Sequence, residues 1–201
     1  INFQDLMLNR IHEILLVASP YYAFILEEDG RLTQQILYEY LGMNLSYAPR
    51  VWHAKSAKKG LQMLADRSYD LVIVMMRITD MDPITFGENV KKDYPDKPII
   101  LLAFDESEIS TLPQKRLKKT IDRVYIWTGN ANVFPAIIKN IEDSMNIERD
   151  FKIADIRSIV MVEDNPRFYS IILPLIYRTA LSHTRSLIDR SLSDTDRLLL
   201  F

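Results

Sequence analysis

The feature that most constrains the fold is a series of short, continuous apolar runs separated by stretches with helical periodicity. Runs of this kind, without polar alternation, are typical of strands that are covered on both faces of a parallel sheet. Because helical patterns connect them, the runs predict a doubly wound α/β sheet of five parallel strands. The five runs are HEILLVA (12–18), RVWHA (50–54), DLVIVMM (70–76), KPIILLAF (97–104) and RVYIW (123–127).

A sixth apolar run, RSIVMV at 157–162, follows these five and precedes a long helical pattern that begins at Pro166. We expect an extra strand and a long helix here, with the helix kinked or split near Leu173 by Pro174. The chain therefore divides into a complete domain at 1–150 and, at 151–201, the truncated start of a second domain, which comprises its first strand and first helix only.

Composition excludes several classes of function. The 201 residues contain no cysteine, which excludes disulfides, thiolate metal sites and cysteine nucleophiles and fits a reducing compartment. A net charge of −2 provides no field that would draw the chain to nucleic acid or to an anionic membrane. The apolar runs are shorter than the roughly 18 residues of a membrane-spanning helix. We expect a cytoplasmic protein without nucleic-acid or membrane partners.

The order and spacing of the elements resemble the receiver domain of two-component response regulators. The stretch DLVIVMMRITDMDPITF at 70–86 is similar to the third strand of a receiver and its following loop, with Met-Asp-Pro at 81–83 where the family usually has Met-Asp-Gly. The resemblance covers about residues 12–148, with an expansion at 20–29 after the first strand. It implies a flavodoxin-like, receiver-type fold.

The resemblance also implies where receiver chemistry would lie. Receivers use an acidic pair after the first strand, an aspartate at the end of the third, a Thr or Ser after the fourth and a Lys after the fifth. In this chain, these positions fall on Ala18 and Ser19, Met75, Ala103 and Thr128. A thioether cannot accept a phosphoryl group, and a hard cation has no carboxylate ligands here. We therefore expect a phosphorylation-incompetent module with no cofactor and no catalytic activity of its own.

The motif VEDNP at 162–166 is similar to the end of the first strand in an intact receiver. Its acidic pair, Glu163 and Asp164, would hold a metal ion if a second receiver were complete. The alternative is that Glu163, Asp164 and Asn165 only cap the helix that follows. We favour capping, because the aspartate that would complete the metal site is missing from these residues.

The chain more narrowly resembles the N-terminal region of bacterial phosphoenolpyruvate synthase or pyruvate phosphate dikinase-like proteins, in which two receiver-like units precede the ATP-binding part. This resemblance implies that catalytic domains of an ATP-dependent phosphotransferase follow in the same protein and are partners of this region. The matching passages are FILEEDGRLTQQIL (24–37), LGMNLSYAPRVW (41–52), LLAFDESEI (101–109), WTGNANVFPAIIK (127–139) and YSIILPLIY (169–177).

Three functional hypotheses follow. The first is a non-catalytic regulatory or interaction domain that transmits conformation or assembly rather than phosphate. The second is a phosphoacceptor receiver of a two-component system that uses a displaced acidic residue, Asp80 or Asp82. The third is a purely structural dimerisation scaffold.

The region 157–190 predicts self-association, because a lone strand and helix cannot bury their own apolar side chains. We expect a homodimer in which this region supplies most of the interface, by helix packing or intermolecular strand pairing. The alternative is that the helix packs back on its own first domain. The predicted interface residues are Phe168, Ile171, Ile172, Leu175 and Ile176.

Overall fold

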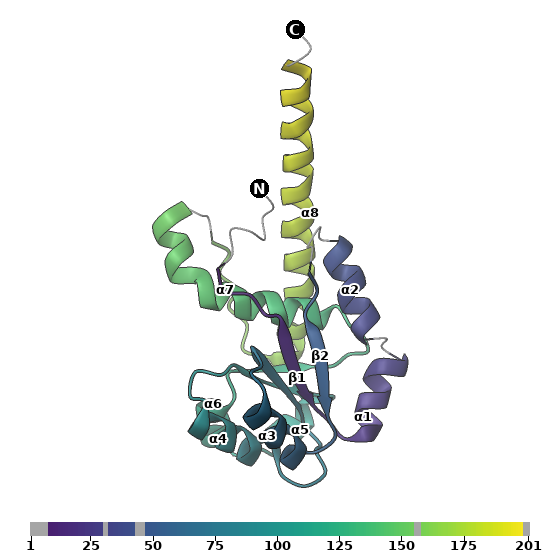
Figure 1. Ribbon diagram of the computed structural model, residues 1–201, viewed down its shortest axis with the longest axis vertical. Helices are drawn as coiled ribbons and strands as arrows, with labels where there is room; N and C mark the ends of the chain where they lie inside the picture. Colours follow the sequence, from purple (N-terminus) through teal and green to yellow (C-terminus); the bar gives the residue numbers. More distant parts are fainter. Residues whose placement is uncertain (1–7, 30–31, 43–46, 155–157, 199–201) are drawn as a thin grey trace.

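One sheet of five parallel strands forms the centre of the protein, in the order β2-β1-β3-β4-β5 (Figure 1). The computed structural model describes residues 8–29, 32–42, 47–154 and 158–198, with side chains except at 28–29, 42, 153–154 and 184–198. The strands are β1 (Glu13–Val17), β2 (Arg50–Ala54), β3 (Leu71–Met75), β4 (Ile99–Ala103) and β5 (Arg123–Ile126). The predicted five-stranded, doubly wound parallel sheet is confirmed.

Helices cover both faces of this sheet (Figure 1). One face carries α2 (Leu32–Gly42) and α7 (Val133–Ala154), and the opposite face carries α3 (Ala57–Asp66), α4 (Pro83–Asp93) and α6 (Gln114–Thr120). A short helix, α5 (Glu106–Ser110), follows β4. The expansion after β1 forms α1 (Pro20–Phe24) and a π-helical turn, η2 (Ile25–Asp29). The chain ends in α8 (Pro166–Leu198).

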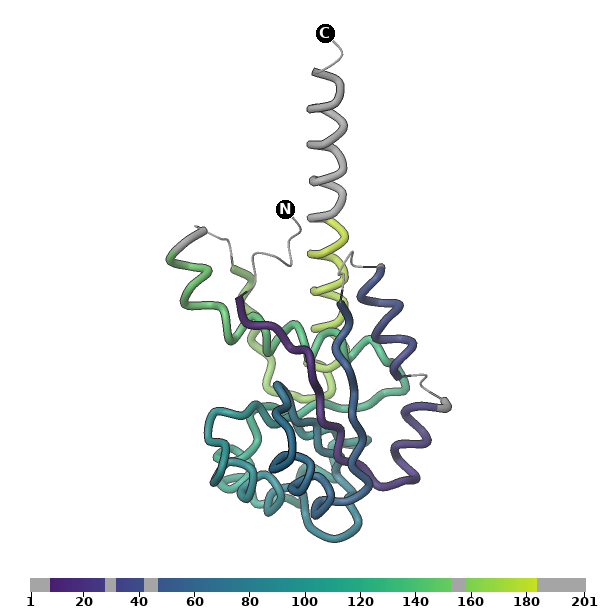
Figure 2. Tube along the Cα trace, in the orientation of Figure 1, coloured from purple at the N-terminus to yellow at the C-terminus, as the bar shows by residue number. Residues whose placement is uncertain are grey.

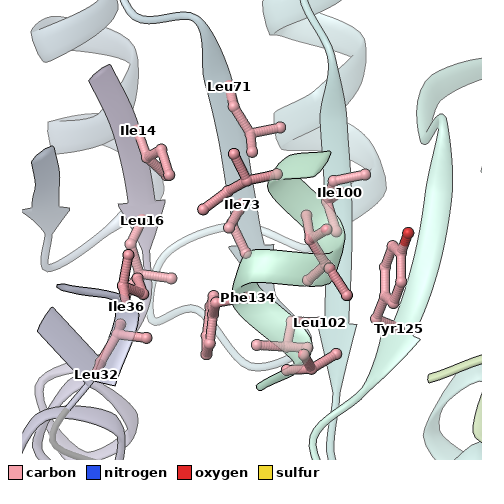
Figure 3. Packing of buried hydrophobic residues seen from close by; sticks show 14 of the residues in the cluster. Ile14, Leu16, Leu32, Ile36, Leu71, Ile73, Ile100, Leu102, Tyr125 and Phe134 are labelled. Atoms are coloured by element: carbon pink, nitrogen blue, oxygen red, sulfur yellow. The ribbon is translucent and has the colours of Figure 1, made fainter. Parts of the chain in front are cut away.

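Alternate residues of the three central strands enter opposite cores, which explains why β1, β3 and β4 are almost wholly apolar. In β1, Ile14 and Leu16 face α2 and α7, whereas Leu15 and Val17 face α3 and α4. Figure 3 shows the first of these cores, where the strand side chains meet Phe134 of α7. Both faces of the three central strands are therefore dry, as the lack of polar alternation in these runs predicts.

The parallel register aligns the carboxyl ends of the strands at one edge of the sheet. Val17 pairs with Val74, Met75 pairs with Leu102, and Ala103 pairs with Ile126. Residues that follow different strands in the sequence therefore share one end of the molecule.

The predicted extra strand at 157–162 is wrong for the residues that the structure describes, because 158–165 belong to no strand. A strand needs the free edge of a sheet, and the β5 edge is already covered by α8. The Ser170 hydroxyl of α8 accepts a hydrogen bond from the Ile126 backbone N–H at 2.8 Å. Of the two effects expected of Pro174, a kink or a split, the split is wrong, since α8 continues through this residue.

The first turns of α8 pack on the body of the protein (Figure 2). Tyr169 and Leu173 are buried in the same core as Phe134, and the Tyr177 hydroxyl donates a hydrogen bond to Asp143 of α7 at 2.6 Å. The helix thus packs back on its own first domain, which was the alternative to self-association, and this packing uses one face of the helix. The assignment of 151–201 to a second receiver-like domain stays a prediction, although α7 extends beyond the expected boundary, to Ala154.

A buried polar cluster ties the segment before β1 to α7. Lys139 and Glu142 form an ion pair at 2.6 Å, with side chains 5% and 3% exposed. The other Glu142 oxygen accepts the Ile11 backbone N–H at 2.9 Å. One turn later, the Asn146 amide accepts from the Asn9 N–H and donates to the Asn9 carbonyl. These bonds fix where the chain enters the sheet.

None of the helices within the described ranges has both the length and the apolar character that crossing a membrane requires.

Candidate functional site

The carboxyl edge of the sheet is the candidate site, because β1 and β3 are neighbours whose connections leave on opposite faces. In open parallel sheets, ligands bind at this kind of switch point. The structure places all five sequence-assigned positions at the ends of β1, β3, β4 and β5. They are Ala18, Ser19, Met75, Ala103 and Thr128.

The centre of this edge is apolar and closed. Ala18, Met75 and Ala103 are each 0% exposed. The Ala18 N–H donates to the Ala54 carbonyl at 3.1 Å, which extends the β1–β2 pairing one residue beyond the strand. Met75 is part of the core that α2 and α7 cover. A side chain at this position therefore contacts protein rather than solvent, and its thioether offers no nucleophilic oxygen.

Ser19 and Thr128 flank the closed centre. Ser19 is half-buried, and its side chain accepts a hydrogen bond from the Tyr22 backbone N–H, so that it caps α1. Thr128 is exposed and lies in the loop after β5, directly before Gly129, whose φ of 81° favours glycine. Neither side chain supplies a carboxylate or an ammonium group to this edge.

Two aromatic rings, which the sequence analysis did not single out, pack beside this edge. Tyr22 of α1 lies against Phe104, the residue after β4, with ring centroids 4.9 Å apart. Both rings are half-buried and pack on the core that contains Met75. The expansion after β1 thus contributes a side chain that packs where receivers bind ligand. The sequence signal that could have indicated this contact is Phe104, an aromatic residue directly after the small Ala103.

The acidic residues near β3 act as helix caps. Asp80 accepts hydrogen bonds from the Ala57 and Lys58 backbone N–H groups, at 2.7 and 3.0 Å, at the start of α3. Desolvation alone would raise the pKa of the Asp80 carboxyl, but these hydrogen bonds lower it below its ordinary value.

Asp82 caps α4 in the same way. Its Oδ1 accepts from the Ile84 and Thr85 backbone N–H groups at 3.1 and 2.9 Å. Desolvation opposes ionisation here too, but hydrogen bonds from Thr85 and Ile84 and the nearby Arg116 guanidinium bring the pKa of Asp82 below its ordinary value. Both carboxylates are therefore committed to helix N-termini.

An acidic side chain of α5 is also engaged. Glu108 of α5 accepts the Phe104 backbone N–H at 3.2 Å and forms an ion pair with Arg77 at 3.0 Å. On the β2 side, the His53 Nε2 lies 3.0 Å from the Ala18 carbonyl oxygen, so that this nitrogen donates to it. Among the described residues, no group of three or more His, Asp or Glu side chains could hold a metal ion.

Glu163 and Asp164 lie in the connection before α8. The Glu163 side chain accepts the Asn165 backbone N–H at 2.9 Å, and the Asn165 side chain accepts the Arg167 and Phe168 N–H groups. Capping, the alternative favoured from the sequence, is the arrangement found for Asn165, and Glu163 bonds to this capping residue. The proposed metal role of this pair stays a prediction that depends on a complete second receiver.

The outward face of α8 is apolar and exposed. Ile176, by contrast, is half-buried. The exposed fractions are 55% for Phe168, 43% for Ile171, 38% for Ile172 and 59% for Leu175. These positions recur at helical spacing on the side opposite Tyr169 and Leu173, so α8 has two apolar faces, of which one packs on the body of the protein.

Comparisons with known proteins identify the fold. No family model and no curated protein sequence matches this chain. Similar solved structures include the signal receiver domain of an HD domain-containing protein from Pseudomonas fluorescens Pf-5, with 25% identity, a TM-score of 0.52, and coverage of 71% of this chain and 95% of that one.

Two further solved structures agree. The response regulator protein TrrA from Thermotoga maritima, in complex with Mg²⁺ and BeF, is 18% identical, with a TM-score of 0.51 and coverage of 65% and 99%. A CheY-like receiver domain protein from Methanospirillum hungatei JF-1 is 17% identical, with a TM-score of 0.51 and coverage of 68% and 98%. This chain therefore has the receiver fold. None of these comparisons supports the narrower resemblance to phosphoenolpyruvate synthase.

Proposed function

We propose that this chain is a non-catalytic regulatory module, a receiver-type domain that transmits conformation or assembly without taking a phosphoryl group. The observation that carries the proposal is Met75, which is wholly buried at the end of β3, where the receiver resemblance places the phosphoacceptor aspartate. Its neighbours at the same edge, Ala18 and Ala103, are also buried and carry no polar side-chain atom.

Phosphoryl transfer to a receiver needs an oxygen nucleophile, a hard cation and groups that neutralise the transferred charge. The described edge offers the Met75 thioether in place of the first, Ala18 and Ser19 where the acidic pair would stand, and Ala103 where a hydroxyl would stand. Tyr22 and Phe104 pack on the core that contains Ala18 and Met75, and Ala103 lies in the core on the opposite face of the sheet. Each requirement is thus missing at its own position, and a single substitution would not restore the set.

The rival hypothesis, a phosphoacceptor that uses Asp80 or Asp82, is less well supported. Each of these carboxylates accepts two backbone N–H groups at a helix N-terminus, and a phosphorylated aspartate would have to give up these bonds. Neither lies among side chains that could bind a divalent cation, within the described part of the chain.

The test is the intact mass of the protein after incubation with acetyl phosphate and Mg²⁺. We expect no gain of about 80 Da, the mass of one phosphoryl group. Asp80→Asn and Asp82→Asn, which keep a capping side chain, serve as matched variants. A gain of about 80 Da in the wild type that one of these variants abolishes would instead establish that this aspartate is a phosphoacceptor.

The exposed face of α8 supports a second element of the proposal, homodimeric assembly through 157–190. Phe168 and Leu175, both more than half exposed, lie two turns apart on this face. Residues 155–157 and the side chains of 184–190 lie outside the described residues. The partners of the module would then be a second copy of this chain, bound through this surface, and the attached catalytic domains that the narrower resemblance predicts.

Sedimentation tests the assembly. We expect a dimer at tens of micromolar, and loss of the dimer in Phe168→Glu and Leu175→Glu. Ile147→Glu on α7, at a side chain with 49% exposure, is the control and should stay dimeric. A monomeric wild type at this concentration would contradict the assembly without bearing on phosphorylation.

A further inference from the structure

The connection between α7 and α8 contains an exposed apolar segment without a strand partner. Residues 158–162, Ser-Ile-Val-Met-Val, are assigned to no helix or strand. Ile159 is 70% exposed, Val160 81% and Val162 92%. β-branched side chains favour strands, and three of them in one exposed run are uncommon outside an edge or an interface.

Within this exposed segment, one residue contacts the body of the protein. Val160 and Val162 point to solvent, whereas Met161 between them is half-buried and packs on the core beneath α2 and α7. Met161 therefore anchors one face of the segment. In the described part of the chain, no backbone hydrogen bond joins 158–162 to another element. The segment thus presents its donors and acceptors to a partner strand.

The charges at the two ends of the segment favour one orientation of such a partner. In the sequence, Arg157 directly precedes it and Glu163 directly follows it. If two copies pair antiparallel about Val160, each Arg157 stands opposite a Glu163, and opposite charges across a strand pair stabilise it. A parallel, in-register pair would place like charges against each other.

We propose that residues 158–162 pair with the same segment of a second copy of this chain, as an antiparallel two-stranded ribbon whose two-fold axis passes beside Val160. The ribbon rests on the homodimeric assembly proposed above and specifies its contact. Ser158 then stands opposite Val162, and Ile159 stands opposite Met161. The pairing satisfies backbone groups that the sheet cannot reach, because α8 covers the β5 edge.

Single cysteines test the ribbon against a cysteine-free background. Residues directly opposite each other in an antiparallel pair have Cα atoms about 4.5–5.5 Å apart, within disulfide range. Val160→Cys should therefore form a disulfide-linked dimer when it is oxidised with copper phenanthroline. Val162→Cys alone should not, because its two copies would be about 14 Å apart, four strand rises.

The mixed reaction makes the register specific. Ser158→Cys mixed with Val162→Cys should give the disulfide heterodimer. Tyr38→Cys on α2, at a side chain with 76% exposure, is the control for random collision and should form no disulfide-linked dimer. Crosslinking at Val160 and Val162 alike would indicate a parallel pair and overturn the antiparallel ribbon. Absence of the Val160→Cys crosslink would overturn it as well.

Sedimentation of the wild type distinguishes failure of the ribbon from failure of the homodimeric assembly. A wild-type dimer without the Val160→Cys crosslink would mean that the assembly holds through α8 and the ribbon is wrong. A monomer would refute both the assembly and the ribbon, and it would leave the segment to the sheet of a complete second receiver or to a different protein. The phosphorylation assay by intact mass is independent of all these outcomes.

Discussion

The Ser170 hydroxyl lies 2.8 Å from the backbone nitrogen of Ile126 and accepts its hydrogen bond at the outer edge of the sheet. The same hydroxyl donates to the Pro166 carbonyl one turn earlier in α8, at 2.6 Å. A helical side chain thus takes the place of a neighbouring strand at β5. This contact attaches the first turns of α8 to the edge of the sheet.

Replacement of Ser170 by alanine should weaken this attachment. The Ile126 N–H would lose its acceptor while it remains buried, so we expect the free energy of unfolding to fall by about 1–3 kcal/mol. Ser144→Ala is the matched control, because Ser144 donates to the Asn140 carbonyl in the same way but is exposed. Urea denaturation should show a lower midpoint for Ser170→Ala only. Equal midpoints for both variants would mean that the edge contact contributes nothing.

The central strands β1, β3 and β4 were predictable because their apolar composition indicates burial on both faces of a sheet. The sixth run, RSIVMV, has the same composition but no strand in the described residues. Whether it pairs depends on a free edge, and α8 covers that edge through Ser170. The availability of an edge is a property of the whole fold, which local sequence does not record.

Part of the candidate site was also predictable from the sequence. Ala18, Met75 and Ala103 could be placed because parallel strands end together, so that counting along each strand locates the edge. The contact between Tyr22 and Phe104 could not, since it joins residues from two different loops. The capping roles of Asp80 and Asp82 likewise depend on how the loop after β3 approaches α3 and α4.

Met75→Asp should destabilise the protein without restoring phosphorylation. The new carboxylate would be buried among apolar side chains, and an uncompensated buried charge costs about 3 kcal/mol or more. Met75→Leu, which conserves volume, should cost less than about 1.5 kcal/mol. Thermal unfolding compares the two variants. Intact mass after acetyl phosphate and Mg²⁺ should show no phosphoryl group on Met75→Asp, and clear labelling of this variant would show that the site has been misread.

Asp82 should contribute to stability in a pH-dependent manner. Its folded-state pKa lies below its ordinary value, near 3.8, so the contribution is complete above that value and disappears as the pH falls through the folded-state pKa. Asp82→Asn keeps a capping oxygen but does not titrate. The difference in unfolding free energy between wild type and Asp82→Asn should therefore shrink as the pH is lowered from about 6 to about 2. A constant difference over this range would mean that the carboxylate charge plays no part in the cap.

The ion pair of Lys139 and Glu142 should behave as a buried unit. Both side chains are almost fully buried, and Glu142 also accepts the Ile11 N–H, so Glu142→Gln keeps an acceptor for Ile11 while it removes the charge that faces Lys139. We expect this single variant to lose about 3–5 kcal/mol, because the ammonium group stays buried without this carboxylate.

The double variant, Lys139→Met with Glu142→Gln, should recover part of that loss, since it removes both charges and keeps the volume of the lysine side chain. Glu88→Gln, which breaks the exposed pair with Arg116, is the control and should change stability little. Urea denaturation of the wild type, of Lys139→Met and Glu142→Gln alone and of the double variant completes a double-mutant cycle. A double variant less stable than Glu142→Gln alone would mean that the lysine stabilises the fold through contacts other than this pair.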